Sequence, residues 1–119
     1  MRLTWININD NGGVFRNMTP EILKRYTDIG FTVAGLMCDL NATDDDIRYI
    51  KYLWAEAGLE FGPIGSGNDA IFFHPDPNVA RKGKEYFKKV LEIGGKLGCE
   101  TVRYAAGSMD PKGRWNTHW

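Results

Sequence analysis

The sequence predicts an α/β fold built from successive parallel βα units. Three times along the chain, a helix-forming segment ends at a glycine and a short apolar segment follows, at Gly30, Gly58 and Gly98. Glycine tolerates the left-handed conformation that ends a helix, and a link of one or two residues makes the next strand run parallel to the one before it. Because such folds carry their chemistry on the loops that follow the strands, we expect the functional residues there.

Length and composition set the scale of the protein. The 119 residues form at most one domain, which is about half the roughly 250 residues of a complete eight-stranded α/β barrel. The sequence is 43% hydrophobic and 25% charged, which fits an ordinary soluble core. Its formal net charge of +0 gives no electrostatic footprint for nucleic acid or a membrane surface.

Cysteine usage and the first residues indicate a compartment. Cys38 and Cys99 fall in no CxxC or CxxH pattern, so we interpret them as reduced thiols. Residues 1–7 lack the apolar run and small-residue cleavage site of a secretion signal, and no stretch of about 18 apolar residues occurs. We therefore expect a cytoplasmic protein with no membrane segment.

The first half of the chain predicts two strands and a helix between them. Residues 3–8 alternate as a strand does, and residues 31–37 are apolar almost throughout, as a parallel strand covered on both faces should be. The helix between them begins at Thr19 as N-cap, with Pro20 in the first helical position and Glu21 in the first turn. Its expected buried stripe is Ile22, Leu23, Tyr26 and Ile29.

A second helix opens at Thr43 with three acids in its first turn. Asp44, Asp45 and Asp46 resemble a metal site at first sight. The simpler interpretation is that they complement the helix dipole, with Asp46 in the position of a capping box. The expected inner stripe is Ile47, Ile50, Leu53, Trp54 and Ala57. Trp5, Trp54 and Phe61 are interpreted as core residues.

The remaining sequence predicts a third strand at 59–64, a third helix and a fourth strand at 101–105. Asp76 is the expected N-cap of the helix, followed by Pro77. The helix is expected to turn Val79, Tyr86, Phe87, Val90, Leu91 and Leu97 inward. Gly94 and Gly95 weaken it by about 1 kcal/mol each relative to alanine, so we interpret the pair as a close approach to the sheet. The chain then reads as one partial domain over 1–119, a (βα)3β half-barrel with a C-terminal loop tail.

An open half-barrel leaves two strand edges unpaired and a strip of apolar sheet uncovered. Natural proteins avoid or cover such surfaces. We expect a C-terminal half or a second chain to supply the cover. Two copies that pair head to tail would form a closed, symmetric homo-oligomer.

Three stretches of the sequence carry a family resemblance. They are Gly65-Ser66-Gly67-Asn68, then His74-Pro75-Asp76-Pro77-Asn78-Val79-Ala80, then residues 86–102, which end in Leu97-Gly98-Cys99-Glu100-Thr101-Val102. With them the chain resembles, over nearly its whole length, the N-terminal half of the sugar phosphate isomerase/epimerase family. These are xylose isomerase-like TIM barrels. The fold that the resemblance implies is the N-terminal half of a TIM-type (βα)8 barrel.

The resemblance also implies a function. Such enzymes depend on a divalent metal (Mn, Mg, Co or Zn) and isomerise or epimerise a sugar or polyol by proton transfer next to a carbonyl. Their metal ligands, typically two Glu with an Asp and a His, lie mainly on strands five to eight. This chain would therefore supply the substrate-side wall and would be inactive alone. Many relatives carry a His in the loop after the third strand, where this sequence has Ser66.

Polar residues at the expected carboxyl ends of the strands are the candidate substrate-binding residues. They are Asn7, Asp39, Ser66, Asn68, Arg103 and Ser108, with His74 as a further candidate. Each sugar hydroxyl left unpaired in a closed site costs about 1–3 kcal/mol, so hydroxyl, amide and charged groups suit such a ligand. Arg103 either lines a wet pocket or forms a structural ion pair. His74 is either a base or ligand, or a residue that orders the start of the third helix.

Alternatives from other functional classes remain open. A non-catalytic half-barrel that binds a small polar ligand or self-assembles is the second hypothesis. An endonuclease IV type activity is disfavoured because it needs several histidine ligands and a basic face, and the sequence has 2 His and no net charge. His74 and His118 form no metal motif. Trp115 and Trp119 in the tail pack on a missing half, line a sugar site or mark a boundary. We therefore expect a sugar or polyol as partner, and neither nucleic acid nor membrane.

Overall fold

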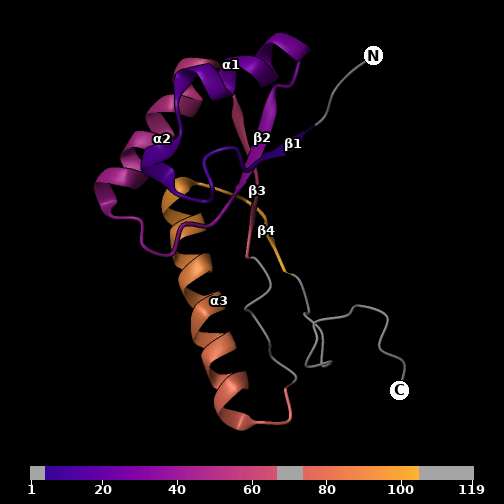
Figure 1. Ribbon diagram of the computed structural model, residues 1–119, viewed down its shortest axis with the longest axis vertical. Coiled ribbons are helices and arrows are strands. Elements are labelled where there is room, and N and C mark those ends of the chain that lie inside the picture. The colour runs from indigo at the N-terminus through magenta and orange to yellow at the C-terminus, as the bar shows by residue number, and fades with distance from the viewer. Residues whose placement is uncertain (1–4, 67–73, 105–119) are drawn as a thin grey trace.

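The computed structural model describes residues 5–66 and 74–104. In chain order, the elements are β1 (Ile6–Ile8), the 3-10 helix η1 (Phe15–Asn17), α1 (Pro20–Ile29), β2 (Val33–Met37), α2 (Asp44–Ala57), β3 (Glu60–Gly65), α3 (Pro77–Leu97) and β4 (Val102–Arg103). The strands form one sheet in the order β1-β2-β3-β4, and all neighbouring strands run parallel (Figure 1). The predicted alternation of parallel strands and helices is confirmed.

The helices begin where the capping residues predict. The Thr19 hydroxyl accepts a hydrogen bond from the backbone N–H of Ile22, and the Asp76 carboxylate accepts one from that of Asn78. At the start of α2, Thr43 and Asp46 form a reciprocal capping box, with distances of 3.0 and 3.2 Å. These bonds satisfy N–H groups that have no partner within the helix. The interpretation of the acids at this position as a helix start is confirmed for Asp46.

The hydrophobic core lies between the sheet and the helices. Trp54 of α2 is 1% exposed, and its indole N–H donates a hydrogen bond to the carbonyl oxygen of Ala34 in β2 at 2.9 Å. Its ring stacks on Phe61 of β3 with ring centroids 5.2 Å apart. The indole therefore attaches α2 to two neighbouring strands, and in Figure 1 α2 and α3 lie to the left of the strands. The other large buried side chains include Ile8, Phe15, Met18, Leu23, Leu36, Ile50, Ile64, Val90 and Leu97.

Three predicted core residues are exposed instead. Ile29 is 65% exposed, Leu91 47% and Trp5 43%. Ile29 is the last residue of α1, directly before the Gly30 C-cap. Leu91 follows the fully buried Val90, and one helical position rotates a side chain by about 100°, which carries Leu91 out to solvent. Trp5 precedes β1 at an edge of the sheet.

Some boundaries also differ from the prediction. The strand expected over residues 31–37 begins only at Val33, because Phe31 donates its N–H to Tyr26 in the Gly30 turn that ends α1. The helix η1 was not predicted; the N–H of Phe15, its first residue, donates to Asp39, which is distant in sequence. The predicted end of the fourth strand, residue 105, lies outside the described residues.

Glycines fix how closely β2, β3 and α3 approach. A Cβ atom on Gly35 would lie 2.3 Å from the carbonyl oxygen of Pro63, so only glycine fits at this point of β2. A Cβ atom on Gly94 would lie 3.1 Å from Cγ2 of Ile64 and 3.4 Å from Cγ2 of Val102. The predicted close approach of the third helix is thus confirmed at Gly94. It is wrong at Gly95, where an added Cβ would meet nothing within 4 Å.

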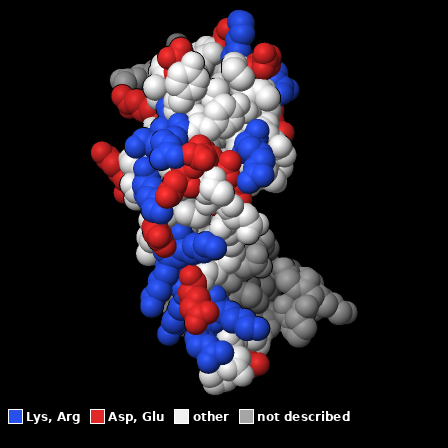
Figure 2. All heavy atoms as spheres, turned by 90° about the vertical axis from the view of Figure 1, so that its left-hand side faces the viewer, with Lys and Arg blue, Asp and Glu red and all other residues white. Residues whose placement is uncertain are grey.

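The exposed side of the helices is highly charged. Lys and Arg side chains gather along α3 with acids between them (Figure 2). Across the two described ranges, none of the helices combines the length and the apolar content needed to cross a membrane.

The two adjacent glycines of α3 provide a matched test of this packing. Gly95→Ala should raise the free energy of unfolding by about 0.5–1 kcal/mol, because alanine is the better helix former and the site is open. Gly94→Ala should be less stable than Gly95→Ala by about 1–3 kcal/mol, because the methyl group must displace β3 and β4. Urea unfolding of both variants measures the difference, and equal stabilisation would contradict this packing.

Candidate functional site

One face of the sheet is turned away from α3. Ile64 and Val102 face Gly94 of α3, and alternation along each strand turns the next residues, Gly65 and Arg103, to the opposite side. We call this side the inner face and define it by Asn7, Gly35, Met37, Gly65 and Arg103. The strand register places Met37, Gly65 and Arg103 side by side at the carboxyl ends of β2, β3 and β4.

Arg103 reaches over the neighbouring strand on this face. A Cβ atom on Gly65 would lie 2.6 Å from Sδ of Met37 and 3.3 Å from Nη2 of Arg103. Both side chains therefore occupy the space that a larger residue at position 65 would fill. Arg103 is exposed. Its guanidinium makes no ion pair or hydrogen bond with another residue of 5–66 or 74–104. Arg103 was predicted either to line a wet pocket or to form a structural ion pair. Within these residues it forms no ion pair.

Asn7 lies on the inner face at the opposite edge of the sheet. It pairs in register with Gly35, and its Oδ1 lies 3.3 Å from the position of a Cβ atom on that glycine. Its Nδ2 donates a long hydrogen bond of 3.5 Å to Asn9. Three strand spacings separate β1 from β4, about 14 Å in a flat sheet. Asn7 and Arg103 thus share a face but do not contact each other.

Asp39 holds together the loops that follow β1 and β2. The residue is 7% exposed, and its Oδ2 accepts the backbone N–H of Phe15 at 3.0 Å. Its Oδ1 accepts the backbone N–H of Asn41, also at 3.0 Å. Backbone groups engage both oxygens, so the geometry supports a role in ordering the rim of the site. A contact between Asp39 and substrate stays a prediction.

Of the other predicted site residues, the structure describes Ser66 and His74. Ser66 is 1% exposed, and its backbone N–H donates to the carbonyl oxygen of Arg103 at 3.1 Å, which extends the ladder between β3 and β4. His74 accepts the backbone N–H of Asp76 on Nδ1 at 3.0 Å, the geometry of a residue that orders the start of α3. Asn68, Ser108, Trp115, His118 and Trp119 lie outside the described residues.

The described residues do not supply a metal centre. Within residues 5–66 and 74–104, no group of three or more His, Cys, Asp and Glu side chains could hold a metal ion. Asp46 is engaged in its helix cap, and Asp39 in its two loop bonds. These residues therefore do not fit the ligand set that the family resemblance implies.

The thiols of Cys38 and Cys99 are held in the neutral form. Burial raises the pKa of Cys38 to about 12, with a further contribution from the negative charge of Asp39. Burial also raises the pKa of Cys99 to about 11. Both residues are free cysteines. Because a thiolate is the reactive form, neither thiol is prepared for nucleophilic chemistry at neutral pH.

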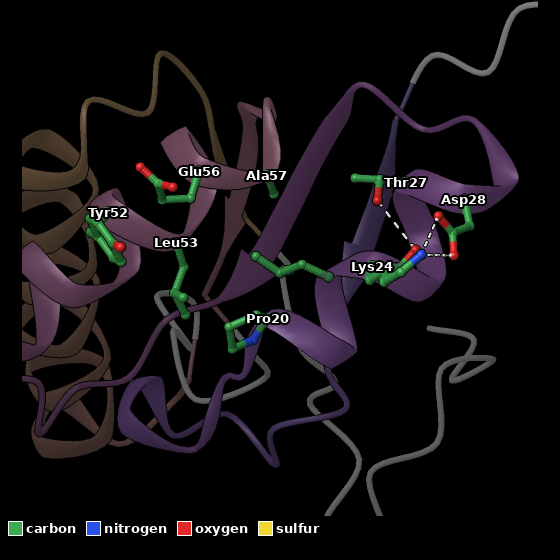
Figure 3. A pocket seen from close by; sticks show the side chains of 9 residues that line it. Pro20, Lys24, Thr27, Asp28, Tyr52, Leu53, Glu56 and Ala57 are labelled. Atoms are coloured by element: carbon green, nitrogen blue, oxygen red, sulfur yellow. Dashed lines mark hydrogen bonds and ion pairs between the residues drawn. The ribbon is translucent and has the colours of Figure 1, made fainter.

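A groove of about 470 Å³ lies elsewhere, between α1 and α2. Leu53 lines it together with the exposed Tyr52 and Glu56 (Figure 3). Leu23 of α1 lines it as well. The ammonium group of Lys24 at its edge is paired with Asp28 at 2.7 Å. All of its lining residues belong to these two helices, so the groove is separate from the carboxyl ends of the strands.

Sequence reasoning missed the part that glycines play in the inner face. Gly35, Gly62 and Gly65 interrupt otherwise apolar strands, and an isolated glycine in a strand often marks a close backbone approach. That signal was present in the sequence. The identity of the neighbour at each glycine depends on the strand register, which the sequence does not state.

Neither a protein-family model nor a curated protein matches the sequence. Solved structures with a similar fold do match it. A solved D-psicose 3-epimerase, crystallised in the presence of D-fructose, matches with a TM-score of 0.65 and 17% identity, over 86% of this chain and 36% of that one. A 3-keto-D-glucoside 4-epimerase from E. coli matches with a TM-score of 0.68 and 14% identity, over 99% of this chain and 45% of that one.

The chain has the fold of half a TIM barrel. The predicted fold class is thus confirmed. The half-barrel spans less than half the length of the two epimerases that it matches. The family resemblance seen in the sequence agrees with these neighbours at the level of fold.

The contribution of the buried Asp39 carboxylate to stability can be tested directly. Asp39→Asn should lower the free energy of unfolding by about 1–3 kcal/mol, because an amide has one acceptor oxygen and would leave a buried N–H group without a partner. Asp28→Asn, which removes an exposed ion pair on α1, should cost at most about 0.5 kcal/mol. Urea unfolding compares the two, and equal stability would contradict the role given to Asp39.

The raised pKa values of the thiols predict a pH dependence of stability. Below the ordinary thiol pKa of 9.0 both states are protonated, and the free energy of unfolding is unaffected by these groups. As the pH rises from about 9 toward about 11 and 12, the unfolded state loses these protons first, so stability falls. Urea unfolding across this range checks it. The double variant Cys38→Ala/Cys99→Ala should fall less steeply, and parallel curves would contradict the assignment.

Proposed function

We propose that this chain is the N-terminal half of a divalent-metal-dependent sugar isomerase or epimerase. It contributes the substrate-side wall of the barrel, and the metal ligands come from outside the described residues. The observation that supports this most is the likeness of fold, over 86% and 99% of the chain, to two sugar epimerases. The reaction type is proton transfer next to the carbonyl of a sugar or polyol.

The chemistry of the inner face is compatible with such a substrate. Asn7 offers an amide beside Gly35, and Arg103 a guanidinium at the carboxyl ends of the strands, the side on which TIM barrels place their active sites. Gly35 and Gly65 add no side chain to this face. Hydrogen-bonding groups at the edges and glycines between them suit a ligand that carries hydroxyl groups around a compact ring or chain.

A second candidate is a non-catalytic half-barrel that binds a small polar ligand or self-assembles. It is favoured by the sheet edges, because β1 and β4 each have one neighbouring strand among the described residues. In both proposals a C-terminal half or a second chain pairs with these edges. A light-scattering mass that equals a dimer, with no bound divalent ion, would favour this candidate over the enzyme.

Exchange of hydrogen with solvent tests the proposed reaction. Keto sugars are incubated in D2O with Mn²⁺, and NMR follows deuterium at the carbon next to the carbonyl. The longest natural polypeptide that contains this chain should catalyse the exchange, and residues 1–119 alone should not. Failure of that longer protein to exchange any keto sugar while it holds the metal would overturn the proposal.

Asn7 provides a variant with a matched control. Asn7→Ala in the longer protein should lower the exchange rate per enzyme by about tenfold to a hundredfold, the effect of one lost hydrogen bond to a substrate hydroxyl. Asn17→Ala, at an exposed position in η1, should leave the rate unchanged. Equal rates for the two variants would remove Asn7 from the substrate wall.

A further inference from the structure

Arg103 is a cation of the inner face that forms no ion pair with any residue of 5–66 or 74–104. Its side chain passes over Gly65, and Nη2 lies 3.3 Å from the position of an absent Cβ atom. No acid of the described ranges forms an ion pair with it. A guanidinium remains charged at every physiological pH and presents a planar fork of donors. An anion stabilises such a group on a face that becomes enclosed.

The acids of the neighbouring elements are engaged or distant. Both oxygens of Asp39 accept backbone N–H groups at the end of β2. Glu60 lies at the opposite end of β3 from Gly65, a distance of about 16 Å for five residues of strand. Glu100 precedes the start of β4 and is exposed. The charge of Arg103 is therefore not neutralised by any of these groups.

The strand ladder holds Arg103 in place. The carbonyl oxygen of Arg103 accepts the N–H of Ser66 at 3.1 Å, and that of Thr101 accepts the N–H of Ile64 at 3.0 Å. Ser66 is 1% exposed, so this part of the ladder is buried. Met37 lies on the other side of the Gly65 gap. The base of the side chain is thus rigid while its charged end is exposed, the arrangement of a residue that binds rather than one that packs.

We propose that Arg103 binds an anionic group, phosphate or carboxylate, of the substrate. This inference rests on the proposed function and deepens it, because it selects a charged sugar derivative over an uncharged sugar. Two oxygens of either group match the donor fork of a guanidinium. The first structural neighbour is named for D-psicose, an uncharged sugar, so Arg103 would separate the specificity of this chain from that one.

Side-chain NMR of the chain tests this without any turnover. The arginine Nε–H signals are followed while fructose 6-phosphate, galacturonate, inorganic phosphate or fructose is added. We expect a phosphate or a carboxylate compound to shift the Arg103 Nε–H signal and the Gly65 amide, with at least about tenfold tighter binding than fructose. Added salt should weaken the binding. Inorganic phosphate that shifts Arg103 as well would support recognition of the anion itself.

Variants separate Arg103 from the other cations. Arg103→Gln should weaken binding of the anionic compound at least about tenfold, and Arg81→Gln on the exposed side of α3 should leave it unchanged. The Arg103 signal of the parent protein is informative even if a variant fails to fold. An Arg103 signal unmoved by every anion, or fructose bound as tightly as both fructose 6-phosphate and galacturonate, would overturn the inference. Exchange of uncharged keto sugars by the longer protein would then leave the proposed function standing.

Discussion

The close contact between β2 and β3 is the constraint on which the rest of the structure depends. Gly35 sits against the backbone of Pro63, where a Cβ atom would be 2.3 Å from a carbonyl oxygen, and β2 shifts its register between Ala34 and Leu36. After that shift Leu36 pairs with Ile64, and both are fully buried under the helices. A slip of one residue would send these side chains to the inner face and expose the core. The register therefore determines both the core and the site.

The same register orders the rim of the site. The N–H of Cys38 donates to the carbonyl oxygen of Gly65 at 2.9 Å, which continues the ladder one residue beyond β2. Asp39 follows immediately, and its carboxylate accepts the N–H of Phe15 at the start of η1, in the connection after β1. A buried carboxylate is stable here because backbone N–H groups replace the water that it loses. Neighbouring loops are thereby held at fixed positions at the carboxyl ends of β1 and β2.

The sequence predicts the parts of this fold whose causes are local. Thr43 and Asp46 lie three residues apart, so the capping box could be recognised without knowledge of any other segment. Leu91 was misplaced because its orientation depends on how α3 rotates against the sheet, which the contact of Gly94 with Ile64 decides. The approach of Arg103 to Gly65 joins residues 38 positions apart through strand pairing. No pattern within either segment contains that information.

The two faces of the sheet are completed in different ways, and this separates stability from function. On the helix face, Trp54, Ile64 and Val90 are 0 to 1% exposed, so the chain satisfies that side with its own residues. On the inner face, glycines leave space and Arg103 keeps a charge that the described residues do not neutralise. Residues of the helix face therefore govern folding. Residues of the inner face govern what completes the half-barrel, because a charged group on a closing surface must meet an opposite charge in the ligand or in the other half.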